Sequence, residues 1–296
     1  MSEQLLTAGD RYTESYEQAL AGLASLVDFA GSSRETTPLT TSILVASDLH
    51  LNTLVLPVLR AYARSKTVFF AGDFTILGST YEQGLIPRIA RLGRRVVAVS
   101  GNHDTSSFMS RLARAGAIVL TRRGRLLPRG RVDGRPVSEI DGLNVAGFDD
   151  PLEARSAEIE TRTLELKRSE VRRAAEEFVA WFRSLPERPD VVLVHQHALA
   201  HALLAALEDD EGRPVVIVTG HDHRQHIHQK GRSVLVDGGT AGAGGAFSIG
   251  VQAAGFAELR FTDQNTLRGV DLIQVEPLSG EATARRIVIE EQPRRE

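Results

Sequence analysis

The chain has 296 residues, of which 42% are hydrophobic and 25% are charged, proportions that are ordinary for a soluble globular protein. A formal net charge of −3 gives no overall basic surface, so a nuclease is disfavoured and a nucleic-acid partner is not expected. The sequence has no cysteine, which excludes disulfides, thiolate metal ligands and cysteine nucleophiles, so any metal must be bound through oxygen and nitrogen.

The N-terminal region is predicted to lie outside the main domain. Residues 1–40 are expected to form an amphipathic helix over 1–30 and a polar linker, and residues 41–296 a single domain. No apolar run approaches the roughly 20 residues of a membrane-spanning helix, and the N-terminus lacks a signal-peptide pattern. We therefore expect a cytoplasmic protein with no membrane span.

In the first part of the domain, apolar runs alternate with segments long enough to form helices. Strands of a buried parallel sheet are predicted at 43–46, 68–71, 96–99 and 118–120. Helices are predicted between them at 53–64, where Pro57 indicates a late start or a kink, at 81–92 and at 106–115. This rhythm is typical of right-handed βαβ units.

The middle of the chain is rich in charge. Six arginines crowd residues 122–135, which favours either a substrate-steering patch or a solvated hairpin with Gly130 and Gly134 in its turns. A strand follows at 143–147. Residues 152–185 are predicted to be a helical excursion that partly covers the sheet, with an apolar stripe at Val171, Ala175, Phe178 and Phe182.

The last third adds two buried strands and a β-rich tail. Strands are predicted at 191–194 and 215–218, with a helix at 198–207 between them, and then at 233–236, 256–261, 270–275 and 286–289. The glycine-rich stretch 238–245 lacks the Lys-Ser/Thr ending of a phosphate-binding loop. It is expected to be a turn where the backbone passes close to another element, and a place at the rim of a site stays open.

Candidate metal ligands directly follow five of these strands. They are Asp48 and His50, Asp73, Asn102 and His103, His195, and His221 with His223. In open α/β sheets, bound molecules and ions lie beyond the carboxyl ends of the strands. Alternate residues of an extended segment point the same way, so each Asp-x-His or His-x-His pair is able to hold one centre. The pattern predicts a metal site.

The order of these motifs resembles the calcineurin-like metallophosphoesterase superfamily. Asp-x-His, Gly-Asp, Gly-Asn-His-Asp, His and Gly-His-x-His occur in sequence between residues 48 and 223. The resemblance implies an α/β fold, a four-layer αββα sandwich of two mixed β-sheets flanked by helices. It also implies two divalent metal ions, with Mn or Fe expected, whereas Zn, Co and Ni also suit nitrogen and oxygen ligands.

The resemblance also implies a role for each residue. One metal would be held by Asp48, His50, Asp73 and His223, and the second by Asp73, Asn102, His195 and His221, with Asp73 bridging. His103 would lie near the leaving group, and Asp104 would orient its imidazole.

Elementary chemistry supports this scheme. Two cations about 3.5–4 Å apart neutralise an anionic ester and lower the pKa of a bridging water, so that hydroxide forms near neutral pH. A protonated His103 can then give a proton to the departing alkoxide, which contributes about 10²–10⁴ in rate.

The remaining polar residues near these motifs have weaker assignments. His195 is favoured over His197 as the ligand because it directly follows the strand, while His197 could contact substrate. Arg224 could reach a phosphate or form a surface salt bridge. His201, His226 and His228 lack such placement and are expected to be solvated or structural.

The leading hypothesis is a phosphoesterase that acts on a small phosphate ester. Small or cyclic nucleotide phosphodiesters are favoured because a compact domain shows no lipid-binding helix and no DNA-binding stripe. A phosphomonoesterase is the alternative within the family. A scaffold or regulatory module that kept the fold is the alternative of another class, and the complete ligand set and the His103–Asp104 pair argue against it.

Overall fold

The computed structural model describes residues 39–53, 55–153, 167–242, 244–245, 252–276 and 281–290. The helix predicted for residues 1–30, its linker, and residues 154–166 of the predicted excursion lie outside the described residues. Among the helices that are described, none has both the length and the apolar character needed to cross a membrane.

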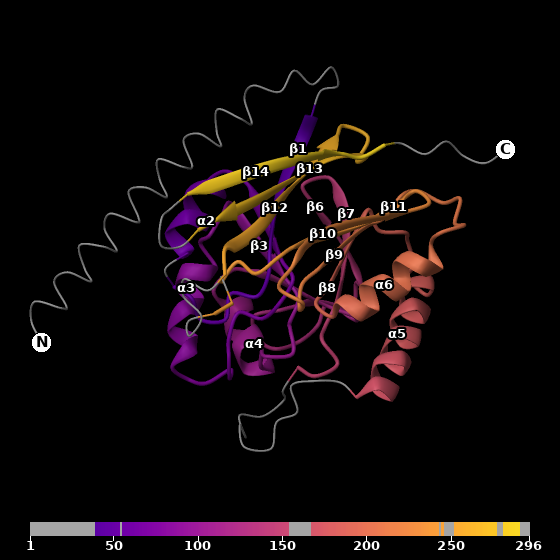
Figure 1. Cartoon of the computed structure of the whole chain (residues 1–296). Helices are drawn as coiled ribbons and strands as arrows, with labels where there is room; N and C mark the ends of the chain where they lie inside the picture. The colour runs from indigo at the N-terminus through magenta and orange to yellow at the C-terminus, as the bar shows by residue number, and fades with distance from the viewer. Residues whose placement is uncertain are drawn as a thin grey trace, which may run out of the picture.

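The first sheet has eight strands in the order β14-β13-β12-β1-β2-β3-β4-β5 (Figure 1). β1 to β4 run parallel to one another, as the βαβ rhythm predicts, and the other neighbours pair antiparallel. The strands are β1 (Leu39–Ala46), β2 (Thr67–Phe70), β3 (Arg95–Ala98), β4 (Ile118–Thr121), β5 (Gly124–Leu126), β12 (Ala254–Thr262), β13 (Leu267–Val275) and β14 (Ala282–Val288).

The second sheet has six strands in the order β10-β11-β9-β8-β7-β6. They are β6 (Val137–Ile140), β7 (Leu143–Phe148), β8 (Val191–Val194), β9 (Val216–Thr219), β10 (Gln225–Lys230) and β11 (Ser233–Gly238). The edge strands β6 and β10 were not predicted. β10 reads Gln-His-Ile-His-Gln-Lys, so its pairing with β11, rather than an apolar run, defines it as a strand.

Side chains that alternate along the strands divide the core into layers. Ile43 and Val45 of β1 pack between the two sheets, against residues such as Val191. Leu44 and Ala46 point the other way, toward the helices on the outer face of the first sheet. Those helices are α2 (Leu56–Tyr62), α3 (Ile86–Ile89) and α4 (Ser106–Arg114).

The outer face of the second sheet is covered by α5 (Arg168–Arg183) and α6 (His197–Ala206). Phe178 and Phe182 of α5 and Leu203 of α6 pack against Val192 and Val194 of β8. In Figure 1, α2, α3 and α4 lie on one side, α5 and α6 on the other, and the sheets between them. The predicted four-layer αββα sandwich of two mixed sheets is confirmed.

Two predicted helices differ in extent from the structure. Residues 81–92 form a 3₁₀ turn, η1 (Glu82–Leu85), followed by the short α3, because Pro87 lacks an N–H and fits only the first turn of a new helix. In the predicted 152–185 excursion, Pro151 and Leu152 form a turn, and the described helix begins only at Arg168.

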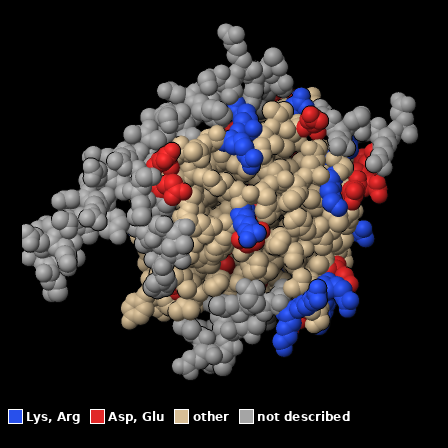
Figure 2. Space-filling view, viewed as in Figure 1, with Lys and Arg blue, Asp and Glu red and all other residues tan. Residues whose placement is uncertain are grey.

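Residues 122–135 form largely a solvated hairpin, the second of the two structures that the sequence suggested for this arginine-rich region. Gly130 and Gly134 have φ of 78° and 76°, and most of the arginines are exposed. Arg122 differs, since its guanidinium lies 4.2 Å from the Phe148 ring centre and its Nε 3.2 Å from Asp149. On the described part of the face in Figure 2, basic and acidic side chains are interspersed without a broad basic area.

Glu258 of β12 is hydrogen-bonded to β1, to the end of α2 and to the loop before β2, and its ionisation gives a testable pH dependence. Its carboxylate accepts hydrogen bonds from Tyr62 (2.6 Å), from Lys66 (2.7 Å) and from Ser42. Burial alone would raise the pKa of Glu258, but the Lys66 ammonium and these hydrogen bonds hold it below its ordinary value of 4.5. The ionised form therefore stabilises the fold above pH 4.5, and this contribution is lost as the pH falls through the lowered pKa.

We expect Glu258→Gln to lower the free energy of unfolding by about 2 kcal/mol at pH 7, with a difference that narrows below pH 4.5. Urea unfolding at several pH values measures it. Glu208→Gln is the matched control, because Glu208 also pairs with a lysine, Lys230, but its side chain is 54% exposed. That variant should change stability by less than about 1 kcal/mol. A Glu258→Gln difference that is constant from pH 7 to pH 3.5 would contradict this assignment.

Candidate metal centre

Loops at the carboxyl ends of β1, β2, β3, β8 and β9 meet where the two sheets come together. The loop after β1 is hydrogen-bonded to the loop after β2, through Asp48 N–H to the Gly72 carbonyl (3.0 Å) and Leu49 N–H to the Asp73 carbonyl (2.8 Å). The Asp48 carboxylate in turn accepts the His221 N–H from the loop after β9 (3.1 Å). Side chains from five separate strands are thereby brought into one site.

The backbone of this site is strained. Asp48, His50, Asp73, His221 and His223 have positive φ values of 54°, 42°, 58°, 82° and 62°. This left-handed region is unfavourable for residues with a Cβ, by about 1–2 kcal/mol each, and such strain gathers at functional sites. Close packing maintains it: a Cβ at Gly101 would lie 2.1 Å from Asp73 Oδ1.

One group of side chains surrounds His50. Its Nε2 lies 3.1 Å from His223 Nε2 and 3.7 Å from both Asp48 Oδ1 and Asp73 Oδ2, and His223 Nε2 lies 3.4 Å from Asp48 Oδ1. The structure thus brings together the four residues expected to hold the first metal.

A second group surrounds Asn102. Its Oδ1 lies 2.8 Å from His195 Nε2 and 3.1 Å from His221 Nδ1, and His195 Nε2 lies 3.2 Å from Asp73 Oδ2. These are the four residues expected to hold the second metal. One atom, Asp73 Oδ2, contacts both groups, which is the arrangement a bridging carboxylate requires.

Backbone carbonyls fix the orientation of the His50 and His195 rings. The Thr75 carbonyl lies 3.2 Å from His50 Nδ1, and the Ala71 carbonyl lies 2.6 Å from His195 Nδ1. A carbonyl accepts only, so each Nδ1 carries a proton, and Nε2 is the nitrogen that faces the centre and could bind a metal ion in place of a proton. This outer contact is the one that metal-binding histidines ordinarily make.

The charges around the centre favour a cation. Burial would raise the pKa of Asp48 and of Asp73, but neighbouring histidines, His223 first for Asp48 and His195 first for Asp73, bring both pKa values below the ordinary value. Burial would likewise lower the pKa of His195, yet the Asp73 carboxylate raises it well above 6.5. Two buried carboxylates therefore stay ionised and attract positive charge. The oxygen and nitrogen donors, their burial and their convergence all fit divalent metal ions.

Asp104 has a structural role that the sequence did not indicate, and its predicted role beside the His103 imidazole stays a prediction. Its carboxylate accepts from the backbone N–H groups of Asp73 and Gly101 (2.9 Å each) and Phe74 (3.0 Å), so it ties together the loops after β2 and β3. The contact that orients the His103 ring is the Ile76 carbonyl, 2.6 Å from Nδ1. A tight turn folds the Asp104 N–H back to the Gly101 carbonyl (3.2 Å).

Asp104 is also in an unusual electrostatic position. Burial, and then the nearby Asp73 carboxylate, raise its pKa to about 7. His103 itself is tied to the same centre, because its backbone N–H donates to Asp73 Oδ1 at 2.9 Å.

Two supporting carboxylates were not singled out from the sequence. Glu82, 4% exposed, accepts the N–H groups of Ile76 (2.6 Å) and Leu77 (3.1 Å) and so shapes the loop whose carbonyls orient His50 and His103. Asp150, 3% exposed, accepts from Gln196 Nε2 (2.9 Å), beside His195. A signal existed for Asp150, since it follows an apolar strand just as Asp48 and Asp73 do. Glu82 carried none, because it lies in a segment that reads as helix.

The glycine-rich stretch packs its backbone against the loop after β1. Ala241 N–H donates to the Ser47 carbonyl (2.8 Å), Gly242 N–H to the Asp48 carbonyl (3.0 Å), and the Thr240 hydroxyl also to the Asp48 carbonyl (2.9 Å). A Cβ at Gly242 would lie 2.0 Å from the Leu49 carbonyl oxygen. The predicted close backbone approach is confirmed for the described part of the stretch 238–245, which excludes residue 243.

The two weaker substrate candidates are close in sequence to candidate ligands, at the start of α6 and before β10. His197 is the first residue of α6, and its ring is 5.1 Å from that of His201. Arg224 is exposed in the turn before β10. Their substrate roles stay predictions.

Several solved structures are similar to the chain at low sequence identity. Vacuolar Protein Sorting 29 from Cryptosporidium parvum is 14% identical, with a TM-score of 0.43, over 86% of this chain and all of that one. The sulfate thiohydrolase SoxB from Thermus thermophilus is 13% identical, with a TM-score of 0.47, over 84% of this chain and 59% of that one. A putative 5'-nucleotidase from Staphylococcus aureus is 16% identical, with a TM-score of 0.42, over 77% and 52%.

No curated protein sequence matches the chain. A family model does match it over residues 42–252, a span that includes every candidate ligand in the two groups around His50 and Asn102. The chain belongs to the calcineurin-like phosphoesterase superfamily.

Proposed function

We propose that this protein is a phosphoesterase that depends on two divalent metal ions. The observation that carries the proposal is the pair of buried donor groups that share Asp73 Oδ2, 3.7 Å from His50 and 3.2 Å from His195. Asp48, His50, Asp73 and His223 would hold one ion, and Asp73, Asn102, His195 and His221 the other. When bound, such ions supply positive charge for an anionic ester and a water of lowered pKa.

The protein's own residues complete the chemistry. The Ile76 carbonyl fixes Nδ1–H of His103, so its Nε2 is the atom that exchanges a proton with the leaving oxygen. Asp104 holds the loops of Asp73 and Asn102 in register and is a positioning residue. Asn102 and the histidines are neutral ligands, so the bound centre keeps net positive charge for its substrate.

The substrate class that we propose is a small phosphodiester, such as a small or cyclic nucleotide. The interspersed surface charge on the described face in Figure 2 gives no stripe for a long polyanion, which supports a small ester. A phosphomonoester is the alternative, and a direct comparison of the two decides between them. Mn or Fe is the proposed metal.

Metal removal and restoration test the proposal. Protein stripped with chelator should lose hydrolysis of bis(p-nitrophenyl) phosphate and regain it with Mn²⁺, with two equivalents retained per chain by elemental analysis. p-Nitrophenyl phosphate, assayed beside it, gives the diester-to-monoester ratio. Metal-independent turnover would overturn the mechanism, and no turnover of either ester with two Mn²⁺ bound would favour a scaffold.

A further inference from the structure

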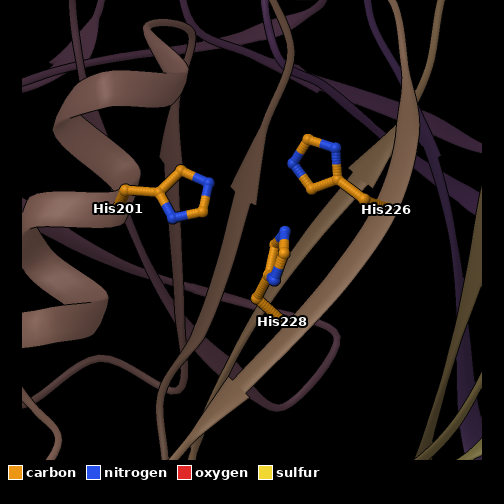
Figure 3. Close-up of side chains that lie close together, drawn as sticks. All are labelled: His201, His226 and His228. Atoms are coloured by element: carbon orange, nitrogen blue, oxygen red, sulfur yellow. The ribbon is translucent and has the colours of Figure 1, made fainter.

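A second group of histidines lies outside the candidate metal centre. His201 comes from α6, and His226 and His228 come from the edge strand β10. Figure 3 shows the three rings turned toward one another. Ring centres are 5.0 Å apart for His201 and His228, and 4.9 Å apart for His226 and His228. One ring nitrogen from each lies within 4.8 Å of the other two.

Strand alternation and helix packing explain this convergence. Ile227 packs toward the core between the sheets, so its neighbours His226 and His228 point to the outer face, where α6 lies. Lys230, two residues further on, points the same way and reaches Glu208 just beyond α6 (3.1 Å). Three imidazoles from two elements thus lie on one face of the second sheet.

Two buried atoms in this region have no hydrogen-bond partner among the described residues. They are His226 Nε2 and Asp237 Oδ2. Asp237 is fully buried and faces His226 directly across the β10–β11 pair. An orphaned imidazole nitrogen costs about 1–3 kcal/mol unless something binds it. A metal ion would satisfy His226 Nε2, whereas a proton would put a buried charge among neighbouring histidines.

The other nitrogen of His226 faces a carboxylate. Its Nδ1 lies 3.8 Å from Asp222 Oδ2. A carboxylate behind a ring is the usual outer partner of a metal-bound histidine, and it directs the opposite nitrogen toward the metal.

We propose that His201, His226 and His228 form a third metal site, separate from the phosphoesterase centre and selective for an imidazole-binding ion such as Zn²⁺. Zn–N bonds of about 2.0–2.1 Å bring tetrahedral ligand atoms to about 3.3 Å from one another. The site therefore closes by a small rotation of the partly exposed His201 and His228 rings. Bound metal would join α6 to the sheet edge.

The test counts zinc and does not depend on hydrolysis. Chelator-stripped full-length protein is loaded with Zn²⁺, passed through a desalting column and analysed for metal per chain. The wild type should retain one equivalent more than the double variant His201→Gln/His228→Gln. Lys230→Gln is the matched control, because it lies on the same strand and face, and it should retain as much zinc as the wild type. Equal zinc in all three proteins would overturn the proposal.

A second measurement uses the wild type alone, so a poorly folded variant cannot obscure the answer. Diethylpyrocarbonate modifies free imidazole nitrogen, and peptide mass spectrometry locates the modified rings. Zn²⁺ should protect His201 and His228 at least tenfold, and removal of zinc should restore their modification. Unchanged labelling of these two histidines with zinc present would rule the site out, whatever the phosphoesterase centre binds.

Discussion

Asp73→Asn should abolish ester hydrolysis, with a loss of at least about 10³-fold in kcat/KM and of at least one bound metal ion. Asn keeps the shape and tolerates the left-handed backbone of Asp73 (φ 58°). It removes the negative charge that contacts both donor groups through one oxygen. Without that charge two cations repel each other at close range, and several kcal/mol of transition-state stabilisation are lost. Steady-state kinetics with elemental analysis measures both effects.

The same substitution at Asp141 provides the matched control. Asp141 also has a left-handed backbone (φ 54°) and a largely buried carboxylate, but it pairs with Arg94 (2.6 Å) and Arg95 (2.8 Å). It also accepts a hydrogen bond from Thr67, at the opposite end of β2 from Asp73. Asp141→Asn should lower stability and leave kcat/KM and metal content at wild-type values. Wild-type turnover by Asp73→Asn would remove the bridging role.

His103→Ala should lower kcat by about 10²–10⁴ while both metal ions stay bound. The ring is held by the Ile76 carbonyl at 2.6 Å and lies 4.9 Å from the His50 ring, at the edge of the first donor group. A proton donor matters most when the departing oxygen is strongly basic. The loss should therefore be large for an alkyl ester and small for a p-nitrophenyl ester, whose leaving group departs as a stable anion.

This leaving-group comparison separates catalysis from metal binding. If His103 were a ligand, its removal would lower hydrolysis of both esters alike and reduce the metal retained per chain. A uniform loss of that kind would contradict the assignment of His103 as the proton donor. Asp104→Asn, by contrast, acts on the loops, so its effect should be the same for both leaving groups.

The convergence of the candidate ligands could be predicted because they follow apolar strands that are easily recognised in the sequence. Each apolar run, such as Val191–Val194 before His195, is fully buried and ends at the same edge of its sheet. The partners of Asp104 could not be predicted, since four backbone N–H groups from two loops depend on the tertiary fold. The cluster of His201, His226 and His228 could not be predicted for the same reason. β10 has one apolar residue and was not recognised as a strand, and α6 lies beside β10 only in the folded protein.

The backbone contacts of the glycine-rich stretch determine when, during synthesis of the chain, the loop after β1 can be completed. The Asp48 carbonyl and its Thr240 partner are 192 residues apart in sequence. At about 5–20 residues per second, the loop that carries Asp48 and His50 leaves the ribosome roughly 10–40 s before the chain that braces it. Until then the loop of these two candidate ligands can form its hydrogen bonds to the loop after β2 but not those to the glycine-rich stretch. The proposed metal ions would therefore meet a complete site only after translation has passed residue 245.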